Sequence, residues 1–137
     1  MEKTLFICKP DAVRRGLVGE ILRRLENKGL RFLALEQRTI TEDEAKEHYV
    51  EHAAKGFFED LVTFITSGPS VLVVVSGEGE VVKIVRGIMG STDPSNANPG
   101  TIRGDLATMV SENLVHGSDS LMAAQREIKL FFPNLEV

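Results

Sequence analysis

The chain has 137 residues, of which 42% are hydrophobic and 26% are charged, and its formal net charge at pH 7 is -4. This length and composition suit one folded domain with a single core and exclude a disordered or collagen-like chain. The acidic balance argues against a dedicated nucleic-acid binder, whose surface would be basic. We expect one domain over residues 1–137, in which any bound phosphate meets a local basic pocket.

No apolar run is long enough for a membrane helix, which needs about 18 such residues. The longest run, residues 71–75, has the length of a strand, and the apolar stretch near the N-terminus is too short for a secretory signal. The single cysteine, Cys8, excludes an intrachain disulfide and favours a reducing compartment. We therefore predict a cytoplasmic protein that does not associate with membranes.

The first predicted elements are a strand, a helix and a second strand. Residues 4–8 are short and β-prone, and Pro10 ends that strand in a turn because proline cannot donate to a sheet. Apolar residues at i, i+3, i+4 and i+7 from Val18 predict an amphipathic helix that ends near Lys28, before a glycine. A second strand follows over residues 30–38.

A capping box marks the start of the next helix. In such a box the threonine side chain accepts from the third helical amide, and the glutamate at that position reaches back to the threonine amide. Thr41 and Glu44 have this spacing, so we predict a helix that begins at Glu42 and carries His48 and Tyr49.

The rest of the chain shows helix and strand signals around one long loop. Apolar stripes predict helices over residues 57–65 and 81–89, which flank a buried strand over 71–75. Residues 91–104 contain two prolines and little apolar content, so we expect a long ordered loop, which inside a compact domain is usually functional. Next we expect a short strand over residues 113–116, a helix capped by Asp119 or Ser120 that runs to about Leu130, and a tail from Phe131 to Val137.

This order of elements predicts the fold class. Two β-α-β units, separated by a helical pair and followed by a final helix, are typical of an α+β, ferredoxin-like fold. Its split β-α-β arrangement forms a four-stranded antiparallel sheet covered by helices.

His116 is the strongest candidate for chemistry. It stands at the end of the predicted short strand, and Gly117 after it leaves room for other groups to approach the ring. An isolated histidine is most often an ordinary surface or core imidazole. A neutral imidazole is also a competent nucleophile near pH 7, which is the functional alternative.

The predicted loop and the helix before it carry side chains that suit phosphate. Arg86, Thr92, Thr101 and Arg103 offer forked guanidinium donors and neutral hydroxyl donors, although a solvated loop with incidental charges would look the same. Neither a GxxxxGK[ST] loop nor a GxGxxG turn is present, so the common phosphate motifs are excluded. Taken by itself, Phe57 at the start of an amphipathic helix is more often a core residue than a residue that stacks on a base. Taken by itself, Lys9 at the end of a strand could bind a ligand or serve only as a solubilising charge.

Six segments together resemble the nucleoside diphosphate kinase family in order and spacing, in its short bacterial form: LFICKPDAV, GLVGEILRRLENKG, HYVEH, ITSGP, PGTIRGD and NLVHGSDS. The resemblance implies a ping-pong reaction in which His116 accepts the γ-phosphoryl group of a nucleoside triphosphate such as ATP or GTP and passes it to a nucleoside diphosphate. The sequence departs from many members at Gly56, where proline is frequent, and at Leu106, where an aromatic residue is frequent.

The resemblance also implies roles for the other site residues. Glu127 would hold the second imidazole nitrogen of His116. Ser118 carries no role from the resemblance, but its place just after the histidine would let it orient the ring or complete a local hydrogen-bond network. Phe57 and Val110 would enclose the base. The remaining side chains would act around the phosphates and the ribose: Lys9, Tyr49, Arg86, Thr92, Arg103 and Asn113. Mg2+ would arrive with the nucleotide, so no protein metal site is expected.

The family also implies a closed homo-oligomer, a tetramer or a hexamer, with contacts near residues 93–104 and each active site within one chain. Two rival functions are an RNA-binding module and a histidine phosphocarrier. The first would need an aromatic signature on a central strand, whereas residues 71–75 are aliphatic. The second has no use for the arginines and threonines of the loop.

Overall fold

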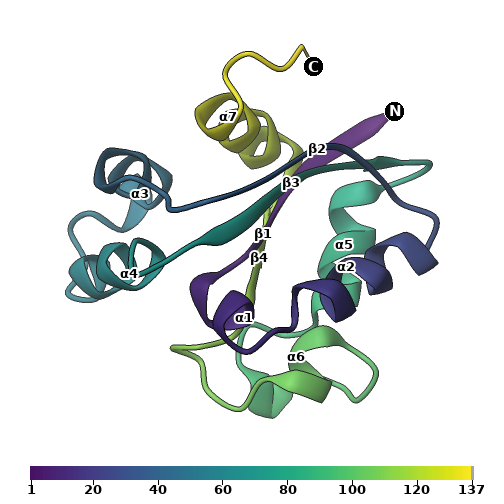
Figure 1. Cartoon of the computed structure of the whole chain (residues 1–137), viewed down its shortest axis with the longest axis horizontal. Coiled ribbons are helices and arrows are strands. Elements are labelled where there is room, and N and C mark those ends of the chain that lie inside the picture. The colour runs from purple at the N-terminus through teal and green to yellow at the C-terminus, as the bar shows by residue number, and fades with distance from the viewer. Residues whose placement is uncertain (137) are drawn as a thin grey trace.

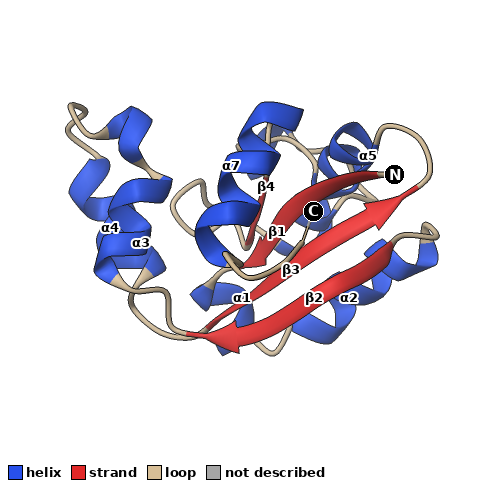
Figure 2. Cartoon of the chain, turned by 90° about the horizontal axis from the view of Figure 1, so that it is seen from above, coloured by secondary structure: helices blue, strands red, loops and turns tan. Residues whose placement is uncertain are grey.

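The computed structural model describes residues 1–136. Its centre is a four-stranded sheet in the order β2-β3-β1-β4, made of β1 (Glu2–Cys8), β2 (Arg31–Arg38), β3 (Ser70–Gly77) and β4 (Val115–Gly117). Every neighbouring pair is antiparallel, and β2 forms one outer edge, as Figure 2 shows. The predicted α+β, ferredoxin-like sheet is confirmed.

The helices cover both faces of this sheet. They are α1 (Pro10–Arg14), α2 (Val18–Asn27), α3 (Glu42–His48), α4 (Phe58–Ile65), α5 (Val81–Met89), α6 (Ile102–Leu106) and α7 (Leu121–Phe131), with 3-10 turns at Val50–His52 and Pro94–Asn96. In Figure 1, α1, α2, α5 and α6 lie on one side of the strands, and α3, α4 and α7 lie on the other. No helix in the described part of the chain is long and apolar enough to cross a membrane.

Side-chain alternation along the strands divides the buried residues into two cores. On β1, Phe6 and Cys8 face the core under α1, α2, α5 and α6, whereas Leu5 and Ile7 face the core under α3, α4 and α7. This period of two is the expected consequence of strand geometry. All eight residues of β3 are buried, so β3 is central, as the aliphatic run predicts.

The helix caps explain where two of the helices begin. The Thr41 hydroxyl accepts from the Glu44 amide at 3.1 Å, and the Glu44 carboxylate accepts from the Thr41 amide at 3.0 Å. This completes the predicted capping box. The cap of α7 is Ser120 and not Asp119, because the Ser120 hydroxyl accepts from the Ala123 amide at 3.0 Å.

Two predicted irregular segments contain helices. The predicted turn at Pro10 is the start of α1, since proline suits the first helical position, where no amide donor is needed. The predicted loop over residues 91–104 contains a 3-10 turn, and α6 begins at Ile102. Ile102 is fully buried, so tertiary packing holds this short helix, and the Thr101 hydroxyl caps it.

Several predicted boundaries shift by one or two residues. Tyr49 follows α3 as its C-cap, Phe57 precedes α4 as its N-cap, and Phe131 belongs to α7 and not to the tail. The last strand begins at Val115, because Leu114 before it has a φ of +75°, which no strand residue adopts. Residue 137 of the predicted tail lies outside the described residues.

Candidate active site

His116 is the middle residue of β4 and pairs with Ile7 of β1. Because side chains alternate along a strand and Val115 belongs to the core under α5, the His116 ring projects to the opposite face, toward α3 and α7. The side chain is 24% exposed, so part of the ring is accessible to solvent.

Glu127 of α7 determines which ring nitrogen of His116 carries a proton. Its Oε1 lies 2.7 Å from His116 Nε2 and also accepts from the Ser118 hydroxyl at 2.8 Å. Burial alone would raise the pKa of this carboxyl, but its hydrogen bonds with His116 and Ser118 hold the pKa below its ordinary value. An ionised carboxylate only accepts, so Nε2 carries the proton and Nδ1 of the neutral ring keeps a free lone pair.

A second imidazole packs against the first. The rings of His48 and His116 meet edge to face, with centroids 4.5 Å apart and an interplanar angle of 81°. Burial and then the nearby His116 lower the pKa of His48 to about 3, so His48 stays neutral at physiological pH. Potential metal-ligand atoms of His48, His116 and Glu127 lie within 4.8 Å of one another, but the Glu127 carboxylate is already bonded to His116 and Ser118.

Arg103 is buried and holds together three stretches of backbone. Its guanidinium donates to the carbonyls of Gly90 at 3.1 Å, Asn113 at 3.1 Å and Val115 at 2.7 Å. Burial and then the charge of Arg86 lower the pKa of Arg103 to about 10. Three of its five N–H donors are thus engaged with backbone, and the other two have no hydrogen-bond partner among the described residues.

Arg86 and Lys9 bring further positive charge. Arg86, on α5, donates to the carbonyl of Gly117 at 3.1 Å, directly beside the nucleophile candidate. Lys9 directly follows the last residue of β1, and its ammonium donates to the side-chain oxygen of Asn113. The side-chain amide of Asn113 in turn donates to the carbonyl of Thr92 at 3.0 Å. Burial lowers the pKa of Lys9 to about 8, against an opposing effect of the Asp11 carboxylate.

The residues assigned to the base lie outside this hydrogen-bonded network. Phe57 is 47% exposed and Val110 54% exposed. The Lys55 ammonium lies 5.6 Å from the centroid of the Phe57 ring. A Cβ at Gly56 would meet no atom within 4 Å, so this departure from the family pattern leaves open space.

Tyr49 is adjacent to His48, and burial raises the pKa of its phenol to about 12.

Two residues near the site were not selected from the sequence, His48 and Asp11. His48 lies beside Tyr49 in the HYVEH segment, and Asp11 completes the KPD segment, so the resemblance covers both positions without assigning them a role. Only the tertiary structure brings His48 to His116 and Asp11 to the chain before β4.

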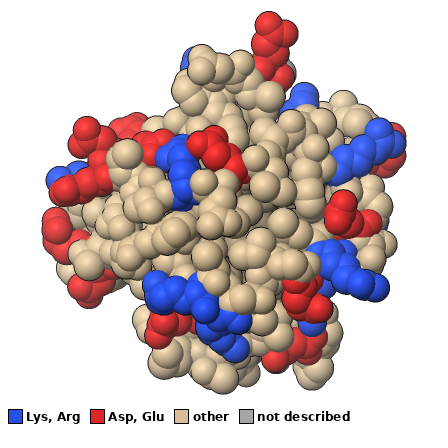
Figure 3. Space-filling model, viewed as in Figure 1, with Lys and Arg blue, Asp and Glu red and all other residues tan. Residues whose placement is uncertain are grey.

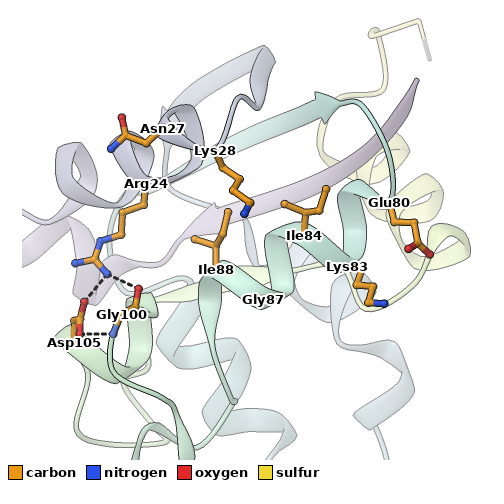
Figure 4. Close-up of a pocket in the computed structure, with 10 residues that line it drawn as sticks. All are labelled: Arg24, Asn27, Lys28, Glu80, Lys83, Ile84, Gly87, Ile88, Gly100 and Asp105. Carbon is orange, nitrogen blue, oxygen red and sulfur yellow. Dashed lines mark hydrogen bonds and ion pairs between the residues drawn. The ribbon is translucent and has the colours of Figure 1, made fainter.

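One surface hollow borders this network and a larger one lies away from it. The bordering hollow, of about 380 Å³, is lined by Arg86 together with Asp119 and Leu121. A hollow of about 760 Å³ between α2 and α5 contains none of the predicted site residues. Arg24 lines this larger hollow, and Figure 4 shows that it pairs with Asp105 at 2.8 Å and donates to the Gly100 carbonyl.

Acidic side chains gather at the edge formed by α3 and α4, on the left of Figure 3. The cations Lys9, Arg86 and Arg103 belong to other elements, so positive charge is concentrated locally in an acidic protein.

The sequence profile of the family described as nucleoside diphosphate kinase matches residues 2–137. Nucleoside diphosphate kinases of Thermomicrobium roseum and Thermobifida fusca are 57% and 54% identical, over 96% and 98% of this chain and 88% and 99% of theirs. A halophilic nucleoside diphosphate kinase from Halobacterium salinarum, solved in complex with CDP, aligns with a TM-score of 0.94 and 48% identity, over 97% of this chain and 88% of that one.

Proposed function

Because this chain belongs to the nucleoside diphosphate kinase family, and so is a phosphotransferase that acts on nucleotides, we propose that its reaction passes through a phosphorylated His116. The observation that carries the proposal is the contact between His116 Nε2 and Glu127, which leaves Nδ1 free. Arg103 and Arg86 donate to the carbonyls of Val115 and Gly117, the residues on either side of His116.

The proposed reaction has two half-steps of the same kind. The lone pair of Nδ1 attacks the γ-phosphorus of a nucleoside triphosphate, an N–P bond forms, and the bond from phosphorus to the bridging oxygen breaks to release the diphosphate. A terminal oxygen of a second diphosphate then attacks the phosphohistidine and the N–P bond breaks. Glu127 offsets the positive charge that the imidazole carries while phosphorylated.

Positioning and charge stabilisation supply most of the catalysis in phosphoryl transfer. We assign phosphate binding to Lys9, Arg86, Thr92, Tyr49 and the two free donors of Arg103. Asn113, already bonded to Lys9, would reach the ribose together with it. Phe57 and Val110 would stack on the base without reading its edge, which allows purines and pyrimidines alike.

Mg2+ would be held by the nucleotide and not by the protein. This ion prefers oxygen ligands, whereas the side chains assigned to the phosphates are mainly cationic and the Glu127 carboxylate is engaged by His116 and Ser118. This donor set fits an ion that would be bound through the nucleotide. When bound there, Mg2+ would neutralise phosphate charge.

An exchange assay tests the proposed function directly. Protein mixed with ATP, Mg2+ and CDP should produce CTP and ADP, and protein with radiolabelled ATP alone should become phosphorylated on histidine. An RNA-binding module or a phosphocarrier that lacks a nucleotide site would make no CTP, and that result would reject the proposal.

The pKa of Lys9 predicts that ADP binding depends on pH. Lys9 titrates near pH 8 in the free protein. Bound phosphates favour its ammonium form, so the complex retains a proton that the free protein loses. Affinity for ADP should therefore fall as pH rises through about 8, by up to tenfold per pH unit. Calorimetry in buffers of different ionisation enthalpy should record proton uptake above pH 8, and Lys9→Met should abolish it. Equal uptake in both proteins would contradict the assignment.

We also propose that the chain is one domain over residues 1–137 and assembles into a cytoplasmic tetramer or hexamer. The edge strand β2 exposes Leu33 and Leu35, at 45% and 52%, and has β3 as its one neighbour in the sheet. An unpaired edge with apolar side chains is a natural contact surface. We assign a second contact to residues 93–104. Sedimentation at micromolar concentration should give four or six subunits, and a monomer would reject the assembly alone.

A further inference from the structure

We propose that Asp11 is a positioning residue for phosphoryl transfer, because its carboxylate holds a strained turn at Leu114, two residues before His116. The inference rests on the proposed role of His116. It is carried by the backbone conformation of Leu114, by the two hydrogen bonds that fix this residue, and by the burial of the groups that make them.

Leu114 is the centre of a classic γ-turn. Its φ is +75°, and it is the one non-glycine residue with positive φ in the part of the chain that the structure describes. The amide of Val115 donates to the carbonyl of Asn113 at 2.9 Å, which closes the three-residue turn. This form of γ-turn is rare and strained. An unsupported leucine would leave it for a conformation with negative φ.

Both backbone groups of Leu114 are held by the segment that follows β1. The Leu114 amide donates to Asp11 Oδ2 at 3.0 Å, and its carbonyl accepts from the Lys9 amide at 2.8 Å. The Leu114 side chain is fully buried in the core under α5, so the core also holds the residue in place. Strained backbone of this kind persists only where its surroundings fix it so completely.

The Asp11 carboxylate has an environment that few carboxylates occupy. The residue is 2% exposed, and its second oxygen, Oδ1, is buried without a hydrogen-bond partner in the described residues. A buried carboxylate with an unsatisfied oxygen is costly. The hydrogen bond from the Leu114 amide is the interaction that this buried carboxylate makes. We therefore assign Asp11 the role of holding the turn.

The turn sets the positions of the groups on both sides of it. On one side, Asn113 meets Lys9 and the Thr92 carbonyl through its side chain. On the other, Val115 begins the three-residue strand that carries His116. The carbonyls of Asn113 and Val115 both accept from Arg103. If Leu114 relaxes, the nucleophile and its cationic neighbours move relative to each other, without loss of any group that contacts the nucleotide.

The test compares a substitution that keeps the hydrogen-bond acceptor with one that removes it. Asp11→Asn keeps a side-chain carbonyl oxygen that can accept from the Leu114 amide, whereas Asp11→Ala removes the acceptor. Both variants remove the Asp11 charge that raises the pKa of Lys9, so the rate of His116 phosphorylation by ATP is measured at a pH well below 8, where Lys9 keeps its proton. In a single turnover on protein shown to be folded by circular dichroism, the rate should fall at least about tenfold in Asp11→Ala and stay within about threefold of wild type in Asp11→Asn. A purely structural residue would lower the melting temperature without this difference in rate. Equal rates in the two variants, both high or both low, would overturn the proposal.

A second pair of variants leaves Asp11 intact and covers the case in which Asp11→Ala does not fold. Leu114→Val introduces a β-branched side chain that strongly resists positive φ, and Leu114→Met keeps a side chain of similar volume that, like leucine, is not branched at Cβ. The valine variant should lose at least about tenfold in phosphorylation rate, and the methionine variant should not. Equal rates would again overturn the proposal. Failure of the wild-type protein to phosphorylate His116 would instead reject the proposed function, and a crystal structure of Asp11→Ala would still test whether Leu114 leaves positive φ.

Discussion

Replacement of His116 by glutamine should abolish formation of the phosphoenzyme and lower nucleotide exchange by more than about 10⁴-fold, as expected when a covalent nucleophile is removed. The fold should survive, because the ring is partly exposed and lies in a strand that β1 holds by backbone bonds. Exchange of γ-phosphate between ATP and CDP measures activity, and circular dichroism checks folding.

Two controls separate the nucleophile from its neighbours. Glu127→Gln keeps the nucleophile and removes only the ionised acceptor, so it should reduce exchange less than His116→Gln does. The wild-type phosphoenzyme should be labile in acid and stable in alkali, as a phosphoramidate is. An acid-stable adduct would point to Ser118 or Ser120, and appreciable exchange by His116→Gln would refute the assigned mechanism.

Arg103→Ala should be the most destabilising single change in the site. It leaves the carbonyls of Gly90, Asn113 and Val115 without their side-chain donor, and Arg103 itself is only 5% exposed. The Asn113 carbonyl keeps its bond from the Val115 amide, whereas the carbonyls of Gly90 and Val115 lose their donor. Each unsatisfied buried carbonyl costs about 1 to 3 kcal/mol, so the free energy of unfolding should fall by about 2 kcal/mol or more. At a temperature where the variant remains folded, kcat should fall more than KM rises, since the removed charge acts on the transferring phosphoryl group.

Arg86→Ala is the matched control for the stability effect. Arg86 makes one hydrogen bond to backbone, with Gly117, so its loss should cost much less free energy of unfolding while kcat still falls. Urea unfolding at a fixed protomer concentration compares the two, because assembly would link stability to concentration. Arg103→Ala with wild-type stability would show that the backbone bonds contribute little.

The fold was predictable where local patterns are consistent with the packing. The aliphatic run at residues 71–75 identified the central strand, and the Thr41 capping box identified the start of α3. Pro10 misled the prediction because proline both ends a strand and begins a helix, and only the next residues' packing distinguishes the two. Five-residue α6 was missed because its stability comes from burial of Ile102 and not from helical periodicity.

The site was predictable only in part from single residues. His116 stood out from its own context, but its partner Glu127 came from the family resemblance, since no spacing rule joins a strand residue to a helix residue eleven positions later. The bonds of Arg103 to backbone leave no trace in residue types. The positive φ of Leu114 could not be predicted from the sequence, because leucine normally adopts a negative φ.

The buried position of Cys8 makes the reactivity of its thiol a probe of how often the folded protein opens. The thiol is the only one in the chain, lies fully buried on β1 at the centre of the sheet, and has its pKa raised to about 12 by burial. A protonated, inaccessible thiol does not react with disulfide or alkylating reagents. Modification of the native protein therefore requires an opening that exposes the central strands, and its rate reports the free energy of that opening in the absence of denaturant.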